Sequence, residues 1–228
     1  MLKEDFKVFK REIEKRKISG LFHFTPTIHL FGIFELGGLV SRAELEKLGK
    51  HELTDCINYP DKLRLDGKKD YINLSITKPN YFLLKDKKNR YRNDPTMEKW
   101  CIIEIDPKYI YYRDTMFSVT NAASTAARKI VGIDGKFETF KKIFAEEIDL
   151  GYKKIPRDNK PPNVPTDIQA EVLVKDKIKI EDFISIYFEN KEDLVITKHA
   201  LKIIDEIRDC LIQEHGIHFE KAFYNNLS

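Results

Sequence analysis

The sequence is poor in the glycine patterns that bind nucleotides in many enzymes. Its 228 residues include 10 glycines, and none of them form a GxGxxG or a GxxxxGK[ST] motif. Both motifs place a glycine-rich loop before a helix, where backbone N–H groups bind phosphates. Their absence excludes the Rossmann and P-loop forms of dinucleotide and nucleotide binding.

Cysteine is also scarce. Cys56, Cys101 and Cys210 lie far apart, with no CxxC pair and no Cys/His pairing at metal-ligand spacing. The six histidines form no HExxH motif, and no GxSxG nucleophile elbow is present. We therefore expect reduced, buried thiols and no metal site, and no motif marks a cysteine or serine nucleophile.

Long apolar runs are missing as well. Runs such as residues 102–103 and 172–174 fall far short of the roughly 18 residues that a membrane-spanning helix needs. The first residues mix both charge signs and lack the apolar segment of a secretory signal. We therefore expect a cytoplasmic protein with no contact to the membrane.

The excess of positive charge is small, because 40 Lys and Arg stand against 37 Asp and Glu. The net charge of +3 does not by itself require a nucleic-acid partner. Basic residues nevertheless gather in two groups, and such groups can bind phosphates. In a chain of which 34% is charged, solvated surface loops are the alternative explanation. The candidate phosphate-binding residues are Lys85, Lys88 and Arg90 in the first group, near Tyr81 and Phe82, and Lys153, Lys154 and Lys160 in the second.

The pattern of apolar residues predicts short strands with helices between them. Strands are expected over residues 21–24, 70–76, 100–105, 110–112, 117–119, 170–174 and 184–188. Helices are expected over residues 4–17, 26–36, 42–50, 122–130, 137–144 and 200–214. Residues 54–69 are expected to form a long polar loop. Residues 151–167, which hold four of the nine prolines, predict a surface loop.

Short strands interrupted by helices favour an α+β fold with a mixed or largely antiparallel sheet over a doubly wound fold. A chain of this length can bury roughly 70% of its unfolded surface as one domain. We expect a single domain over residues 1–228. Its N-terminal helix would fall within residues 1–19, and a C-terminal helical segment, residues 198–228, would pack on the same domain.

Glu171 is the most informative single residue. It stands in an otherwise apolar predicted strand, directly after the proline-rich loop. A carboxylate that is buried or that faces a cleft needs partners or a function. The alternative is that Glu171 lies on the solvent face of an edge strand.

Two further positions carry candidate polar groups. His23 lies between Phe22 and Phe24 and is either a hydrogen-bonding group in a pocket or a satisfied core residue. In the strand over residues 70–76, alternation places Tyr71, Asn73 and Ser75 together on one polar face. We take this face as a second candidate functional surface.

In combination, three segments resemble the DarT family. They are Leu-Phe-His-Phe-Thr at residues 21–25, followed by a helix and Gly-Gly-Leu at 37–39; Asp-Tyr-Ile-Asn-Leu-Ser-Ile at 70–76; and Gln-Ala-Glu-Val-Leu-Val at 169–174. That family comprises the toxins of DarTG toxin–antitoxin systems, which transfer ADP-ribose from NAD to a base in single-stranded DNA. The resemblance implies an ADP-ribosyltransferase-like sheet core, NAD as substrate without a metal, and a neutralising antitoxin, with a macrodomain ADP-ribosyl hydrolase as the candidate.

The resemblance also implies roles for single residues. Glu171 matches the catalytic glutamate of the family. His23 matches a histidine that contacts the NAD ribose, and Thr25 matches a neighbour in the same pocket. Tyr71 is assigned to the same cofactor site.

Two further matches concern the cofactor and the acceptor. Arg64 matches an arginine upstream of the Asp-Tyr strand and would neutralise the NAD pyrophosphate or hold the base. His29 stands where the family commonly has an asparagine; either it substitutes as a hydrogen-bond donor to the cofactor, or the nicotinamide side is held differently. The loop at residues 153–167 corresponds to the substrate-recognition loop.

These roles fit the chemistry of the reaction. Breaking the bond between nicotinamide and ribose builds positive charge on the ribose, which a fixed carboxylate stabilises. A base nitrogen must also lose its proton as it attacks, and Glu171 is a candidate acceptor. The expected function is mono-ADP-ribosylation of a nucleobase in single-stranded DNA by a toxin of a toxin–antitoxin or phage-defence system. The alternatives are transfer to RNA or protein, or a catalytically silent nucleic-acid-binding module, and the target base, thymine or guanine, is left open.

Overall fold

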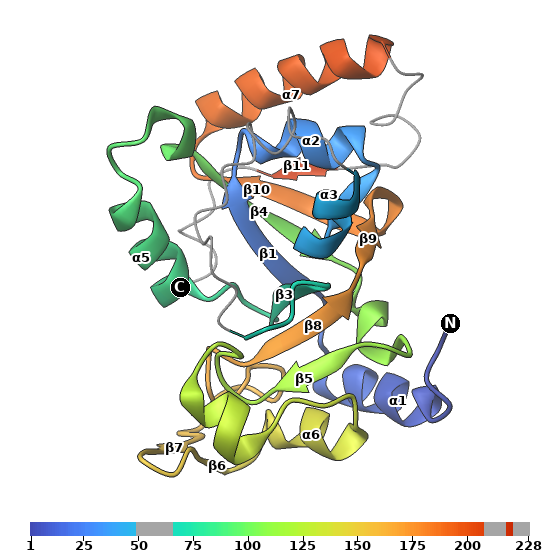
Figure 1. The fold of residues 1–228 in the computed structure, drawn as a ribbon, viewed down its shortest axis with the longest axis vertical. Helices are drawn as coiled ribbons and strands as arrows, with labels where there is room; N and C mark the ends of the chain where they lie inside the picture. The colour runs from blue at the N-terminus through green and yellow to red at the C-terminus, as the bar shows by residue number, and fades with distance from the viewer. Residues whose placement is uncertain (49–65, 208–217, 221–228) are drawn as a thin grey trace.

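The computed structural model describes residues 1–48, 66–207 and 218–220. Its centre is a seven-stranded sheet with the strand order β11-β10-β4-β1-β3-β8-β5 (Figure 1). Neighbouring strands pair antiparallel, except β10 and β11, which are parallel. This confirms the predicted α+β class with a largely antiparallel sheet. The strands are β1 (Leu21–Pro26), β3 (Tyr71–Ile76), β4 (Trp100–Ile105), β5 (Met116–Ser118), β8 (Glu171–Lys175), β10 (Phe183–Phe188) and β11 (His218–Glu220).

Two short antiparallel pairs lie outside this sheet. One joins β2 (Gly38–Val40) to β9 (Lys177–Lys179), and the other joins β6 (Glu147–Asp149) to β7 (Lys154–Pro156). Gly38 has φ +144°, and a Cβ placed there would lie 2.0 Å from the carbonyl oxygen of Ile178. Only glycine therefore allows β2 to approach β9 this closely.

Helices cover the sheet at several places. In Figure 1, α1 and α6 lie near β5, whereas α2 and α7 lie near β4 and β10 at the other end of the sheet. The helices are α1 (Phe6–Arg16), α2 (His29–Glu35), α3 (Arg42–Leu48), α5 (Tyr81–Arg90), α6 (Phe137–Lys142) and α7 (Lys191–Ile207). Three short 3-10 helices are η1 (Pro95–Met97), η2 (Pro107–Tyr111) and η4 (Ile180–Asp182) among the described residues, and η3 (Ala127–Val131) is a short π-helix.

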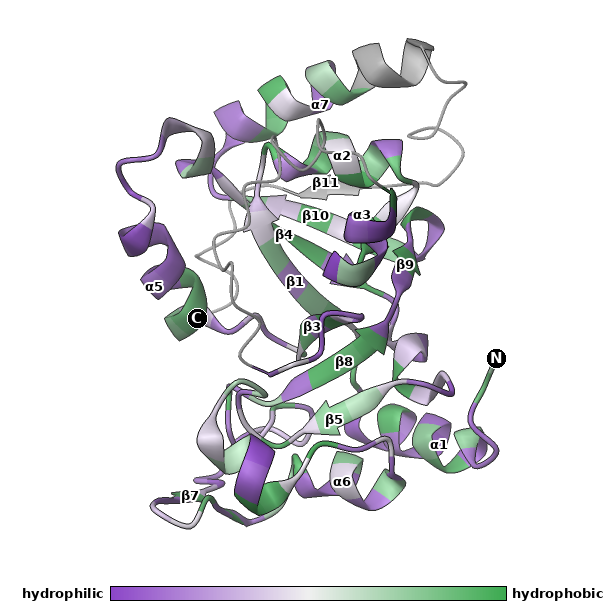
Figure 2. Cartoon of the chain, viewed as in Figure 1, coloured by the Kyte–Doolittle hydropathy of each residue, from purple (hydrophilic) through white to green (hydrophobic). Residues whose placement is uncertain are grey.

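The main hydrophobic core runs through the sheet from one end to the other. It includes Phe9 of α1, which stacks on Phe117 of β5 with ring centroids 5.6 Å apart, and it reaches Leu201 of α7. Figure 2 shows the central strands as mainly hydrophobic and most of α5 as hydrophilic. Cys101 is buried in this core, as the sequence predicts, and burial raises the pKa of its thiol. Cys56 and Cys210 lie outside the described residues.

One predicted strand is wrong, and two predicted helices begin later than expected. β1 continues through Pro26, which pairs with Trp100, so α2 begins at His29 and not at residue 26. The strand expected over residues 110–112 is part of the 3-10 helix η2, because Asp106 accepts a hydrogen bond from the backbone N–H of Lys108 and caps it. The helix expected over residues 122–130 starts late: residues 122–124 form a turn, and the helix begins at residue 125 and continues into η3.

Other elements extend or replace what the sequence suggests. Residues 81–90, which the charge pattern favours as a loop, form α5, capped by the Asn80 side chain on the N–H of Leu83. The last helix begins at Lys191, nine residues before residue 200, because Asn190 accepts from the N–H of Asp193. The loop over residues 151–167 contains β7, where Pro156 ends a two-stranded pair.

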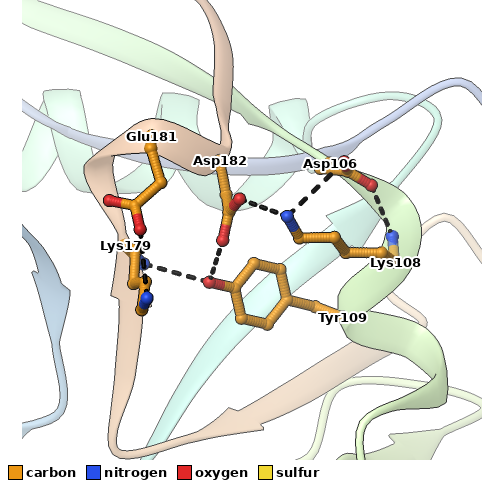
Figure 3. A network of polar contacts seen from close by, with 6 residues as sticks. All are labelled: Asp106, Lys108, Tyr109, Lys179, Glu181 and Asp182. Atoms are coloured by element: carbon orange, nitrogen blue, oxygen red, sulfur yellow. Dashed lines mark hydrogen bonds and ion pairs between the residues drawn. The ribbon is translucent and has the colours of Figure 1, made fainter. Parts of the chain in front are cut away.

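A polar network holds β9 in place. In Figure 3, Tyr109 of η2 donates to Asp182 at 2.6 Å and accepts from the backbone N–H of Lys179 at 3.0 Å. Lys108 forms an ion pair with the same Asp182. Burial, together with the hydrogen bond from Tyr109 to Asp182, raises the pKa of Tyr109. Because β9 pairs with β2, the network positions one wall of the cavity described next.

Candidate active site

Two adjoining cavities open on β1 and β3. The first, of about 270 Å³, lies between β1, α2 and β2, and we call it the β1–α2 cavity. The second, of about 360 Å³, contains Glu171, and we call it the Glu171 cavity. They share four lining residues, so ligands in the two cavities would lie side by side. The shared residues are His23, Phe24, Asn73 and Lys87.

The β1–α2 cavity brings together the predicted cofactor-binding residues. His23, Thr25, His29 and Tyr71 all line it, although they come from β1, α2 and β3. Most of its remaining wall is apolar. Apolar walls with a few converging polar groups are typical of cofactor sites. The apolar residues are Phe24, Pro26, Ile33, Leu36, Leu39, Val40, Leu45, Ile72 and Trp100.

His29 lines this cavity and has one ring nitrogen without a hydrogen-bond partner among the described residues. Its Nδ1 lies 2.8 Å from the Thr25 hydroxyl, whereas its Nε2 is buried and has no hydrogen-bond partner among the described residues. Burial, and to a lesser degree the neighbouring His23, lowers the pKa of His29 to about 4. His29 is therefore neutral near pH 7.

His23 has a defined tautomer. Its Nδ1 lies 3.2 Å from the carbonyl oxygen of Asn73. A carbonyl oxygen only accepts, so Nδ1 carries the proton. In the neutral ring, Nε2 is then the nitrogen that accepts a hydrogen bond.

Glu171 lies at the start of β8 and is not on an edge strand. β8 is paired on both sides, to β3 and to β5, and Glu171 itself pairs with Ser118. The residue is only 8% exposed. The alternative of a solvent-facing carboxylate on an edge strand is therefore wrong.

One oxygen of Glu171 is held by two donors. Glu171 Oε2 accepts from the Asn73 side-chain amide at 3.2 Å and from the backbone N–H of Ala122 at 2.8 Å. The same Asn73 amide nitrogen lies 3.4 Å from Asp66 Oδ2, so a second carboxylate lines this cavity. Among the described residues, no group of three or more His, Cys, Asp or Glu could hold a metal ion.

The first basic group lies beside the Glu171 cavity. Lys85 is exposed on α5, and Arg90, which lines the cavity, forms an ion pair with Asp86 at 2.9 Å. Lys88 pairs with Glu189.

The second basic group lines neither cavity. Lys153 is exposed, and Lys154 pairs with Glu147 at 2.9 Å. The Lys160 ammonium donates to the carbonyl of Thr166 at 3.0 Å, which holds the loop before Glu171. Arg64 lies outside the described residues, so its role stays a prediction.

The sequence does not predict that either donor contacts Glu171. Asn73 carried a signal, because strand alternation places it on the polar face of residues 70–76. The N–H of Ala122 carried none, since any residue other than proline supplies a backbone donor.

Comparison with known proteins identifies the family of this chain. The family model described as "ssDNA thymidine ADP-ribosyltransferase, DarT" matches residues 22–212. A search of curated proteins finds no match.

Solved structures with the same fold include complexes of a Thermus DarT and of a Thermosipho DarTG. A Thermus sp. 2.9 DarT in complex with ADP-ribosylated ssDNA has 13% identity and a TM-score of 0.52, over 90% of this chain and 95% of that one. The same protein in complex with NAD+ also has 13% identity and a TM-score of 0.52, over 89% and 96%. A Thermosipho africanus DarTG in complex with ADP-ribose has 18% identity and a TM-score of 0.52, over 89% of this chain but only 50% of that one.

Proposed function

Because this chain belongs to the DarT family of single-stranded DNA thymidine ADP-ribosyltransferases, we propose that it attaches ADP-ribose to thymidine, with Glu171 as the catalytic carboxylate. The protein is an NAD-dependent ADP-ribosyltransferase that acts on single-stranded DNA. The observation that carries the assignment of Glu171 is its burial in a cavity that shares a wall with the β1–α2 cavity. A carboxylate in this place can act where NAD and the acceptor base meet.

The β1–α2 cavity is the proposed site for NAD. His23 Nε2 would accept a hydrogen bond from a ribose hydroxyl, in keeping with the tautomer that Asn73 imposes. If Thr25 donates to His29 Nδ1, His29 Nε2 carries a proton and can donate to an oxygen of NAD. Tyr71 would contribute to the wall of the same site.

The proposed reaction breaks one bond and forms one. The bond between the ribose anomeric carbon and the nicotinamide nitrogen breaks, and its electron pair stays with nicotinamide. Positive charge develops on the ribose, and the Glu171 carboxylate stabilises it. In thymidine the first ring nitrogen already bears the sugar, so the other ring nitrogen attacks and loses its proton to the carboxylate. Arg64 would stabilise the pyrophosphate or hold the base.

Single-stranded DNA is proposed to approach along α5. Arg90 and Leu83 of this helix line the Glu171 cavity, and Lys85 is exposed on another face of the same helix. Phe82 is 75% exposed, which is unusual for a phenylalanine, and offers a face on which a base can stack. Lys88 would contribute from the same helix, and Lys153, Lys154 and Lys160 would make peripheral contacts to the strand.

The proposed biological role is that of a toxin with an antitoxin partner. We propose as that partner a macrodomain ADP-ribosyl hydrolase that removes the modification, and the cytoplasm as the place of action. Among the described residues, no helix has the length and apolar character to cross a bilayer. We further propose that the chain is one domain, because its main core includes both Phe9 of α1 and Leu201 of α7.

Labelled NAD tests this function directly. The protein is incubated with labelled NAD and matched single-stranded DNA, duplex DNA, RNA and protein pools. We expect label on single-stranded DNA that contains thymidine, and little on a duplex, because a paired base must be extruded at a cost of a few kcal/mol. Label on oligonucleotides without thymine would overturn the choice of base, and label on protein or RNA alone would overturn the choice of acceptor.

A further inference from the structure

We propose that Asn73 is a positioning residue that fixes the Glu171 carboxylate for transfer, an inference that rests on the proposed function of Glu171. The Asn73 amide donates to Glu171 Oε2 at 3.2 Å, and the N–H of Ala122 donates to the same oxygen at 2.8 Å. The last torsion of a glutamate side chain is broad and weakly restrained by itself. Two donors that converge on one oxygen define the plane of the carboxylate.

The position of β3 in the sheet explains why Asn73 reaches Glu171. β3 lies between β1 and β8, and Asn73 is opposite Leu173, two residues beyond Glu171 on β8. Residues two apart on a strand point to the same face, so Asn73 and Glu171 are diagonal neighbours on one face of the sheet. On its other side, the carbonyl of Asn73 accepts from His23 Nδ1. One residue thus orients both polar groups at the wall between the two cavities.

The chemistry of the side chain favours an amide at this position. An asparagine NH2 group has two N–H donors, and two carboxylates, Glu171 and Asp66, lie within 3.2 Å and 3.4 Å of that nitrogen. Aspartate has the same shape, but it would remove both donors and add a third negative charge. Alanine would remove the donors without adding charge.

The consequence for catalysis concerns the orientation of the Glu171 carboxylate. Because Oε2 accepts from two protein donors, the carboxylate is held in one orientation before the positive charge develops on the ribose. Loss of the Asn73 amide would let the carboxylate rotate away from this orientation. The other titratable or charged groups that line the same cavity are His23, Asp66, Asp86, Lys87 and Arg90.

The first experiment compares Asn73→Ala, Asn73→Asp and wild type in DNA transfer assays. We expect kcat to fall by about 10- to 100-fold in Asn73→Ala, because small misplacements of a catalytic group have effects of this size. The KM for NAD should change less than kcat. In Asn73→Asp the acidic limb of the pH–rate profile should move to higher pH, because an added negative charge favours protonation of a neighbouring carboxylate. Asn93→Asp, which adds the same charge at an exposed turn, is the control.

A double-mutant cycle with Glu171→Gln separates this inference from the proposed function. If Asn73 acts through Glu171, Asn73→Ala should lower kcat in the wild type but not in the Glu171→Gln background. A further loss in that background, or wild-type kcat and pH profile in Asn73→Asp, would overturn the role of Asn73. Wild-type activity of Glu171→Gln would overturn the proposed function instead. Melting temperatures of all variants show which are folded, and the isosteric Asn73→Asp keeps the test open if Asn73→Ala does not fold.

Discussion

The two cavities differ in how their polar groups are satisfied. In the β1–α2 cavity the walls are mainly apolar, and His29 Nε2 is buried without a partner among the described residues. In the Glu171 cavity the carboxylate is already held by Asn73 and Ala122. In the first cavity a ligand can supply the hydrogen-bond partner that His29 Nε2 lacks among the described residues. In the second cavity the protein itself already orients the Glu171 carboxylate.

This difference suggests that one cavity serves mainly to bind NAD and the other mainly to catalyse the transfer. Buried polar groups without partners favour a ligand that satisfies them, so the first cavity is suited to binding. A carboxylate that is oriented before the reaction stabilises developing charge without reorganisation, so the second is suited to catalysis. Substitutions in the two cavities should consequently separate NAD affinity from reaction rate.

The largest expected effect is on the rate, in the Glu171 cavity. Glu171→Gln keeps the shape of the side chain and removes its charge, so kcat for DNA modification should fall by about 100- to 1,000-fold. The melting temperature and the binding of NAD, measured by calorimetric titration, should stay close to those of wild type. Wild-type turnover by folded Glu171→Gln would refute the assignment of catalysis to this cavity.

The next effect concerns the free energy of unfolding of the protein at low pH, through His29 of the β1–α2 cavity. The pKa of His29 is lowered to about 4, below its ordinary value of 6.5. Below pH 6.5 the unfolded chain takes up a proton at this residue that the folded chain does not, so stability falls as pH decreases toward 4. The loss is on the order of 3 kcal/mol across that window.

His29→Gln removes this titration. Urea unfolding at pH 7 and at pH 4.5 should show a smaller loss of the free energy of unfolding in the variant than in wild type. The carboxylates titrate in both proteins, so their contribution cancels in the comparison. Equal losses in the two proteins would show that His29 is not buried as a neutral ring.

The sequence anticipates these two cavities unevenly. Glu171 and His23 were identifiable because each interrupts an apolar strand, and strand alternation placed Asn73 on a polar face. The structure places Thr25, His29 and Tyr71 on one cavity, and their role toward NAD stays a prediction. The start of α2 differs from the prediction because pairing with β4 extends β1 through Pro26.

Other parts of the site depend on tertiary structure. The helix α5 was missed because its charges obscured any apolar period, and its start is set by the Asn80 cap. The ion pairs of Lys88, Arg90 and Lys154 follow from residues that come close only in the fold or along a helix face. Spacing along the chain does not reveal which lysines remain available to a phosphate.

A smaller effect is expected for His23, which lines both cavities. His23→Ala removes the proposed hydrogen bond to a ribose hydroxyl, which is worth about 0.5–1.5 kcal/mol. NAD should raise the melting temperature of wild type, since it binds the folded state. The shift should be smaller in the variant, with a Kd for NAD roughly 3- to 10-fold higher. An unchanged Kd would place the ribose away from this wall.

The smallest expected effect concerns Lys85, an exposed lysine of α5. If Lys85 contacts one phosphate of the bound strand, the slope of log affinity against log salt should flatten by about 0.7 in Lys85→Glu. The matched control is Lys10→Glu, because Lys10 is an exposed lysine on α1, which lies away from α5 in Figure 1. Affinity for single-stranded DNA is measured by fluorescence anisotropy across a salt series. Equal slopes in Lys85→Glu and in the control would mean that the strand does not pass along α5, and the exposed Lys153 on the β6–β7 hairpin would become the next residue to test.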